Sequence, residues 1–490
     1  MITHAGIGLL LALALARADN DTHAKLVDLN VVVVDNKGQP VDDLTAGDFE
    51  VTDAGKKRQI AVFRHNNRRL PEIQPIRPNE FSNRSGASTS HATLVLFDLL
   101  NERFGTRGFA ANQIVRELEK METADSLYLY FLTLDGRLFA VHGLPEEEAL
   151  QSKGPPWTRR IKPMMDTAMR RLSLVRPFEM DVYARIQLTF NALDELATQL
   201  SRFPGRKNVV WVTDGVPIML GPQHSYTGEP VDYTPQLRQL SDWFDRCGGS
   251  IYPVRQVMLG SPEAMGAAYG SGIGSEETLD QLAGLTGGRP TGSKDVGAAV
   301  RQAMSDVLTS YQIGYYSSED NWDRKFHKLR VTCKRKGVRV QAKSGYYALP
   351  ETRELEAQQA VDGAMSTPVD AAEIGLRVAL SIDQNDKLHA NISMMIDAND
   401  IAFAREGDGY AGQIMFSVAS YIANGRIVSS PIIPSDLYYS ASEHDPTRKA
   451  EIAFHREIQL GEGVNKVRLI VFDCGSSKAI GSVTIPIQGR

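Results

Sequence analysis

Cysteine is scarce in this chain, since its three residues, Cys247, Cys333 and Cys474, lie far apart in a sequence of 490 residues. At most one intramolecular disulfide can form, so packed hydrophobic cores rather than crosslinks must stabilise the protein. No pair of cysteine or histidine residues has the spacing of a zinc site, which excludes a structural zinc ion. The length exceeds what one hydrophobic core supports and predicts roughly three domains.

An excess of positive charge is also missing. The chain has 54 lysine and arginine residues against 59 aspartate and glutamate residues, and its formal net charge is -5. Proteins that bind nucleic acid carry basic patches that neutralise phosphates. The charge balance therefore excludes nucleic acid as the main partner.

Long apolar runs are absent except at the N-terminus. There "AGIGLLLALALARA" ends in Ala16-Arg17-Ala18, the small-x-small pattern that signal peptidases cleave. We predict a signal peptide over residues 1–18 and an exported protein that is periplasmic, on the cell surface or secreted; the alternative is a buried N-terminal helix. No other segment reaches the ~18 apolar residues that cross a bilayer, so no transmembrane span is expected after signal removal.

Catalytic motifs are missing as well. The sequence has no Gly-x-Ser-x-Gly elbow and no His-Glu-x-x-His zinc motif. The glycine-rich "GSGIGS" at 270–275 lacks the preceding strand and the following Lys-Ser or Lys-Thr of a phosphate loop, and indicates a surface loop. The sequence predicts no enzymatic activity.

Hydrophobic periodicity and turn residues predict an α/β fold class with flanking β structure. Strands alternate with helices from residue 92 onward, which predicts a Rossmann-like, doubly wound and mostly parallel sheet that ends in an antiparallel extension. Short strands broken by turns precede this region, and six strands at the spacing of a β-sandwich follow it. The predicted parts are a β module at 25–66, a linker at 67–91, the α/β domain at 92–348, a linker at 349–368 and a β-sandwich at 369–490.

Two aspartates come at the ends of predicted buried strands. Asp98 ends "ATLVLFD", and Asp214 follows "NVVWVT". In an open α/β sheet the carboxyl ends of neighbouring strands face one crevice, and oxygen ligands suit a divalent cation such as Mg²⁺. The alternative is structural, with Asp214 stabilising a turn before Gly215 and Asp98 capping the next loop or helix.

The segments "VLFDLLNERFG" and "FPGRKNVVWVTDG" resemble a von Willebrand factor A-type domain. Together with "VVVVDNKGQPVDDLTAGDFEVTDAGKKRQIAVF" and "YQIGYYSSEDNWDRKFHKLRVTCKRKGVRVQAKSGYYA", they resemble the secreted VWFA-related proteins abundant in acidobacteria. The resemblance covers roughly residues 25 to 348. It implies a Rossmann-like A domain on an exported protein with no established enzymatic activity.

The resemblance also implies a set of metal ligands. Metal-binding A domains carry Asp-x-Ser-x-Ser after the first strand, a loop threonine and a later aspartate; Asp98 and Asp214 match the two aspartates. The serine positions fall on Leu100, which cannot bind a metal, and Glu102, which can; the threonine has no clear equivalent, because Thr189 lies within a predicted helix. The degenerate metal site implied is Asp98, Glu102 and Asp214, with Asn101 as a further oxygen donor that could contact a partner.

A second candidate binding surface is "PPWTRRIKPMM" at 155–165. Tryptophan and arginine are enriched at binding hot spots, so Trp157, Arg159 and Arg160 are candidate partner-binding residues; the alternative is ordinary packing of Trp157.

The expected function is that of an exported, non-enzymatic protein-binding or scaffold protein. It would act through the rim that carries the strand-end carboxylates, with residues 142 to 180 beside that rim and a divalent cation as a candidate cofactor. The alternatives are a metal-free structural component of the envelope and a Mg²⁺-assisted hydrolase that uses Asp98 and Asp214.

Overall fold

The computed structural model describes most of the chain after residue 24. The described ranges are 25–67, 79–84, 91–102, 104–121, 126–144, 157–172, 182–203, 205–217, 219–220, 228–255, 275–289, 295–317, 322–348, 353–382, 389–406, 408–440, 451–475 and 479–487. The predicted signal peptide at 1–18 and residues 270–274 of the glycine-rich segment lie outside these ranges, and Ser275 begins a helix. No helix within them combines the length and apolar character needed to cross a membrane.

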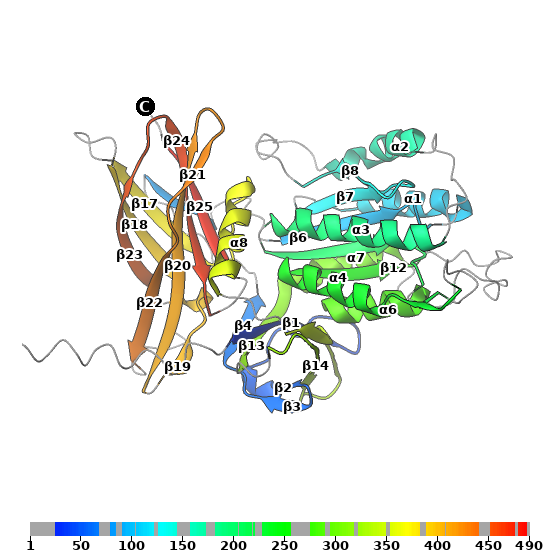
Figure 1. The fold of residues 1–490 in the computed structure, drawn as a ribbon, viewed down its shortest axis with the longest axis horizontal. Helices are drawn as coiled ribbons and strands as arrows, with labels where there is room; N and C mark the ends of the chain where they lie inside the picture. The colour runs from blue at the N-terminus through cyan, green and yellow to red at the C-terminus, as the bar shows by residue number, and fades with distance from the viewer. Residues whose placement is uncertain are drawn as a thin grey trace, which may run out of the picture.

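The predicted fold class is wrong for this chain, because most of its sheets are antiparallel. Strands make up 45% and helices 29% of the structure, and parallel pairing occurs in one of the six sheets described. The alternation of strand and helix, on which the prediction of a doubly wound parallel fold rested, is confined to the middle of the chain. Strand-rich segments on both sides outweigh it (Figure 1).

The middle of the chain forms a five-stranded sheet in the order β12-β9-β6-β7-β8. Its strands pair in parallel, except for the edge strand β8, which is antiparallel to β7. The strands are β6 (His91–Asp98), β7 (Leu127–Leu132), β8 (Leu138–His142), β9 (Arg206–Val212) and β12 (Gly249–Val254).

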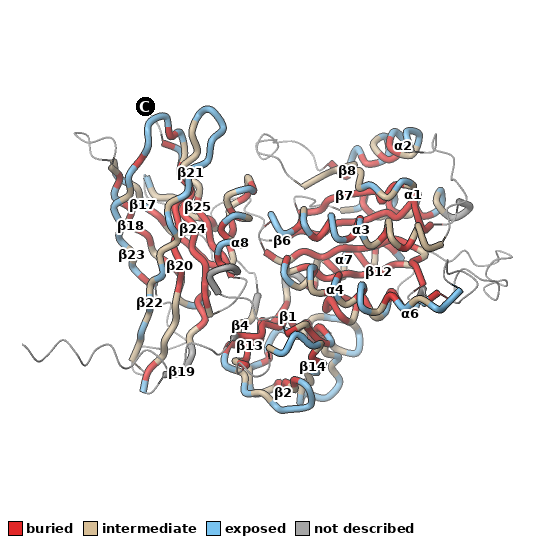
Figure 2. The backbone as a smooth tube through the Cα atoms, viewed as in Figure 1, coloured by how far each residue is buried: buried red, intermediate tan, exposed pale blue. Residues whose placement is uncertain are grey.

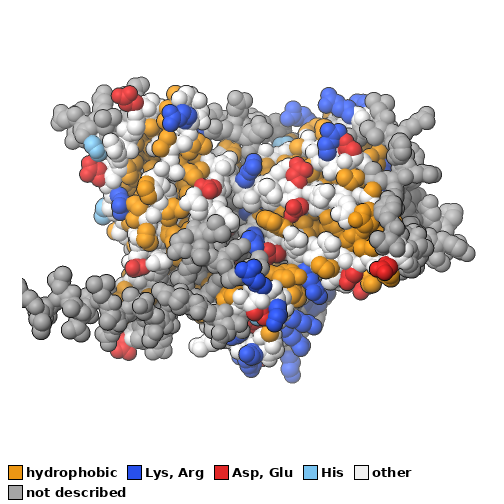
Figure 3. Space-filling model, viewed as in Figure 1, with side chains coloured by type: hydrophobic (Ala, Val, Ile, Leu, Met, Phe, Trp, Pro, Cys, Tyr) orange, Lys and Arg blue, Asp and Glu red, His pale blue; other side chains and the backbone are white. Residues whose placement is uncertain are grey.

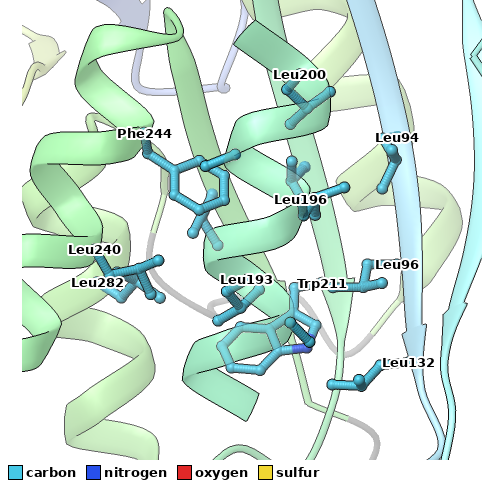
Figure 4. Close-up of a cluster of buried hydrophobic side chains, with 14 of the residues drawn as sticks. Leu94, Leu96, Leu132, Leu193, Leu196, Leu200, Trp211, Leu240, Phe244 and Leu282 are labelled. Atoms are coloured by element: carbon cyan, nitrogen blue, oxygen red, sulfur yellow. The ribbon is translucent and has the colours of Figure 1, made fainter. Parts of the chain in front are cut away.

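Helices cover both faces of this sheet, which explains why its strands are apolar along their whole length. Successive side chains of a strand point to opposite faces, so Leu94 and Leu96 pack on one side and Val95 and Phe97 on the other. Figure 4 shows the first of these cores, and Figure 2 shows buried positions concentrated along the strands. The helices are α3 (Val182–Ser201), α4 (Thr234–Arg246) and α6 (Ser275–Thr286) on the first face, and α1 (Phe104–Leu118), α2 (Ile161–Leu172), its preceding turn η3 (Trp157–Arg160) and α7 (Val296–Leu308) on the second.

The sequence predicts that the strands before residue 348 extend the parallel sheet. The structure differs, because residues 309–347 complete the N-terminal β module. Strand β13 pairs with β1 and β4, and β14 pairs with β2. Tyrosines of β13 pack among the valines of β1, so segments far apart in sequence share one core. The strands are β1 (Lys25–Asp35), β2 (Phe49–Asp53), β3 (Lys56–Arg58), β4 (Val62–Asn67), β13 (Thr309–Ser317), β14 (Phe326–Cys333), β15 (Val338–Gln341) and β16 (Gly345–Tyr347), with η1 (Ala46–Asp48) between β1 and β2.

The C-terminal strands form two antiparallel sheets that pack face to face on one apolar core. One sheet contains β5 (Glu80–Ser82), β17 (Leu376–Ile382), β18 (His389–Asp397) and β23 (Glu451–Gln459); the other contains β19 (Ala404–Glu406), β20 (Gly409–Ile422), β21 (Ile427–Ser429), β22 (Ile433–Ser440), β24 (Val464–Asp473) and β25 (Ile480–Pro486). A short turn, η6 (Ala398–Asp400), follows β18, and a two-stranded ribbon of β10 (Met219–Leu220) and β11 (Val231–Asp232) belongs to the middle region.

Both predicted linkers contain regular structure. The second contains α8 (Arg353–Ser366), which packs on the outer face of the six-stranded sheet. The first contributes β5 to the sandwich, where the buried Asn83 amide donates to the carbonyls of Ala371 (2.6 Å) and Ile374 (2.7 Å). Arg84 binds Asp397 and Asp400 at 3.1 and 2.6 Å. The N-terminal half of the chain is therefore tied into the C-terminal sandwich.

Candidate functional site

Asp98 is the last residue of β6, and its side chain is completely buried. Four donors surround the carboxylate. The Asn101 backbone N–H donates to Oδ1 at 2.9 Å, and Oδ2 accepts from the Asn101 amide at 2.8 Å, the Trp211 indole at 3.2 Å and the Thr213 hydroxyl at 2.7 Å. Because buried carboxylates are stabilised by such donors, these bonds account for the position of Asp98 without any ligand.

Asn101 connects this carboxylate to helix α3. Its amide also donates to the Thr189 hydroxyl at 2.8 Å, and that hydroxyl donates to the Arg185 carbonyl at 2.7 Å. The Asn101 residue is 4% exposed, so its side chain has almost no surface to offer a partner. This placement corrects the sequence interpretation of Asn101 as a partner-binding residue: it joins the loop after β6 to α3.

The other two carboxylates of the predicted metal site come from two different segments of the chain. Glu102 is 2% exposed and follows Asp98 in the same turn, where its N–H donates to the Asp98 carbonyl at 3.0 Å. Asp214 lies after β9, with Oδ1 3.8 Å from the Arg255 guanidinium. Within the described residues, no group of three or more His, Cys, Asp or Glu side chains is arranged to hold a metal ion. The structure does not gather these three carboxylates into one metal-binding group.

An arginine supplies positive charge beside the two buried acids. Arg107 of α1 donates from Nε to the Glu102 carbonyl at 3.1 Å, and the Asp98 and Glu102 carboxylates favour its charged form. Burial lowers the pKa of Arg107 and raises the pKa of Asp98; the hydrogen bonds from Thr213, Asn101 and Trp211 oppose the second shift. The Arg107 guanidinium therefore adds positive charge near the two buried acids.

Sequence reasoning missed three members of this network: Trp211, Thr213 and Arg107. A signal for the first two was present, because residues two apart on a strand share a face. Leu96 pairs with Trp211 in the parallel register of β6 and β9, which brings that face of β9 alongside the end of β6. The Thr213 hydroxyl also accepts from the Gly215 N–H at 2.8 Å, so the turn after β9 holds the hydroxyl in place.

Trp157, in η3, is a core residue. It is 8% exposed, its indole donates to the Leu127 carbonyl at 3.2 Å, and its ring stacks on His142 at 4.3 Å. This corrects the interpretation of Trp157 as an exposed binding anchor and agrees with the packing alternative. The tryptophan fixes η3, and the helix that follows it, against the first residue of β7 and the last residue of β8.

Arg159 and Arg160 follow Trp157 and are exposed. Arg160 lies at one end of a groove of about 490 Å³ between β8 and α2, and Arg171 lies at the other end of α2. Figure 3 shows lysine and arginine side chains gathered over this region. The remaining lining residues are mostly apolar: Phe139, Ala140, Val141, Pro163, Met164, Thr167 and Ala168. We call this feature the β8–α2 groove.

The ionisation of His142 reports on this region. Burial and the nearby Arg160 charge lower the pKa of His142 to about 4. We expect a histidine NMR titration to show a neutral His142 ring at pH 7, and Arg160→Gln to raise its pKa while Arg159→Gln changes it less. The folded pKa of His142 lies below its unfolded value, so protonation favours the unfolded state. His142 therefore lowers the free energy of unfolding as the pH falls from about 6.5 to about 4. An unchanged His142 pKa in Arg160→Gln would contradict the effect assigned to the Arg160 charge.

Comparison of the chain with family models, with curated proteins and with solved structures finds no match in any of the three.

Proposed function

We propose that this chain is a non-enzymatic protein-binding protein that recognises its partner through the β8–α2 groove. The observation that carries the proposal is the combination of an apolar lining with two arginines, Arg160 and Arg171, which have no ion-pair partner among the described residues. Apolar surface supplies binding free energy, and charges without partners at its ends supply specificity and speed of association.

The position of the groove supports this assignment over the rim that carries Asp98. A protein partner needs accessible side chains, whereas Asp98, Asn101 and Glu102 are buried and held in internal contacts. In this proposal the Asp98 network stabilises the end of the sheet, and binding does not depend on a divalent cation. Export and the relation to VWFA-related proteins stay predictions of the sequence.

The test is site-specific photocrosslinking from the groove in cells that express the full chain. Met164→p-benzoylphenylalanine places a crosslinker among the lining residues. We expect a protein adduct that disappears when Arg160 and Arg171 are both changed to glutamate, and that persists with Arg159→Glu, which reverses a neighbouring charge outside the groove. EDTA should leave the adduct unchanged. An adduct that survives the double reversal, or one that requires a divalent cation, would refute the proposal.

A further inference from the structure

We propose that the β8–α2 groove takes an acidic polypeptide segment in extended conformation, which adds to the outer edge of β8 as a sixth strand of the sheet. This inference rests on the proposed function and specifies the chemistry of the partner at the same site. It follows from three properties of the groove: an open strand edge, an apolar wall and the spacing of its two arginines.

The open edge belongs to β8. This strand is last in the order β12-β9-β6-β7-β8, and within the described part of the chain no strand pairs with its outer side. Phe139, Ala140 and Val141 are consecutive, and all three line the groove. Consecutive side chains of a strand point to opposite faces, so a groove that touches all three runs along the strand edge, where no strand among the described residues pairs with the outward backbone N–H and C=O groups. An added strand would satisfy those groups.

The apolar wall matches alternate side chains of such a strand. Phe139 and Val141 lie toward the core beneath α2, and Met164 of α2 packs against the same core. A strand paired with β8 directs every second side chain toward α2. These inward side chains should be apolar in the middle of the bound segment.

The two arginines set the ends of the segment. Residues 157–172 carry five basic side chains against one acidic side chain, and Asp166 is matched with Lys162 at 3.4 Å. Arg160 and Arg171 are eleven residues apart, or about 16 Å along a helix that rises 1.5 Å per residue. An extended chain covers that distance in about five residues. Since acids on the same face are an even number of positions apart, the partner should carry them four or six positions apart.

The probe for this inference is the fluorescein-labelled peptide ETVTVTE, titrated into the full chain and followed by anisotropy. Its glutamates lie on one face with two valines between them. We expect saturable binding, weakened about tenfold or more by Arg160→Glu with Arg171→Glu, and changed less than about twofold by Arg159→Glu. The peptide KTVTVTK should not bind. Circular dichroism checks that the exposed charge reversals leave the fold intact.

Strand addition is tested by two further peptides, which need no protein variant. One is N-methylated at its threonine amides and the other at its valine amides, so that each lacks the donors along one edge. Pairing with β8 predicts that one of the two loses binding and the other retains it. Equal binding of both would overturn strand addition, and stronger binding of KTVTVTK or of anionic lipid vesicles would overturn the acidic-peptide assignment. If ETVTVTE does not bind while the Met164 crosslink still requires Arg160 and Arg171, the inference is wrong and the proposed function stands. If ETVTVTE does not bind and the crosslink does not require the two arginines, the inference and the proposed function are both wrong.

Discussion

Arg468→Met is expected to lower the free energy of unfolding by about 3–5 kcal/mol, because it removes a buried donor that several acceptors share, two of them carbonyls of buried residues. Arg468 lies on β24, on the face opposite the sandwich core, and is 2% exposed. Its guanidinium reaches across to the C-terminal end of α8 and the residues just after it. The acceptors are the carbonyls of Ala364 (2.6 Å), Thr367 and Pro368 (3.2 Å), the Thr484 hydroxyl (2.7 Å) and the Asp370 carboxylate (3.2 Å).

The size of this effect follows from the position of these acceptors. The last carbonyls of a helix have no partner within the helix, and here the helix end is packed against a sheet rather than exposed to water. Methionine fills much of the volume of arginine but donates no hydrogen bond. The substitution therefore leaves the buried carbonyls of Ala364 and Thr367 without this donor, and each buried unsatisfied group costs about 1–3 kcal/mol. Asp370 loses its ion pair with Arg468 but still accepts from the Thr484 N–H and hydroxyl.

Urea unfolding followed by far-UV circular dichroism measures this loss. The matched control is Arg377→Met, on β17 of the facing sheet, where the guanidinium pairs with Glu451 at 2.8 Å and with Glu80 at 3.4 Å and the side chain is 36% exposed. An ion pair at the surface contributes about 0–1 kcal/mol, so the control should unfold close to the wild type. Equal losses in the two variants would show that α8 does not depend on Arg468.

The strands of this chain are predictable from local sequence, but their pairing is not. The run that ends at Asp98 was predicted as a buried strand because its residues are apolar on both faces, and β6 covers it. The partner of a strand is not encoded in such a local pattern. The sequence predicts a strand over residues 310–317, yet only the fold shows that Tyr311 pairs with Val31 rather than with the parallel sheet.

The same limit applies to the candidate sites. The position of Asp98 at a strand end could be read from the sequence, but its donors depend on the register between β6 and β9. In residues 155–165, arginines next to a tryptophan predict a binding surface; Arg160 lines the β8–α2 groove, and its binding role stays a prediction. The ring of Trp157 faces inward, where it stacks on His142 and its indole N–H donates to the Leu127 carbonyl. The sequence alone does not show that these segments are adjacent. The three residues of β5 lie in a region rich in proline, asparagine and arginine, which gives too short a pattern to reveal a strand.

Asp98→Ala is expected to lower the free energy of unfolding by about 3–4 kcal/mol, and neither Mg²⁺ nor EDTA should change this loss. The substitution leaves the Asn101 N–H, the Asn101 amide, the Trp211 indole and the Thr213 hydroxyl without their common acceptor. The wild-type Asp214 carboxylate is 3.8 Å from Arg255, and Asp214→Ala should lower the free energy of unfolding by about 1 kcal/mol. The measurement is urea unfolding of the wild type and both variants, each with Mg²⁺ and with EDTA.

The pH dependence of the same experiment separates the two interpretations of Asp98, because they predict opposite signs. Burial raises the pKa of Asp98 above its unfolded value, so the folded state holds the proton more tightly, and this contribution to stability is lost as the pH rises through the raised pKa. A divalent cation requires the ionised carboxylate, and would instead raise stability with pH, by about 2.7 kcal/mol at a hundredfold excess over Kd.

Asp98→Asn removes either dependence while it keeps the side-chain shape. We expect the wild type to lose stability relative to Asp98→Asn as the pH rises from about 4. A gain that appears only with Mg²⁺, and that is absent from both Asp98→Asn and Asp214→Ala, would instead establish a metal site at the end of β6.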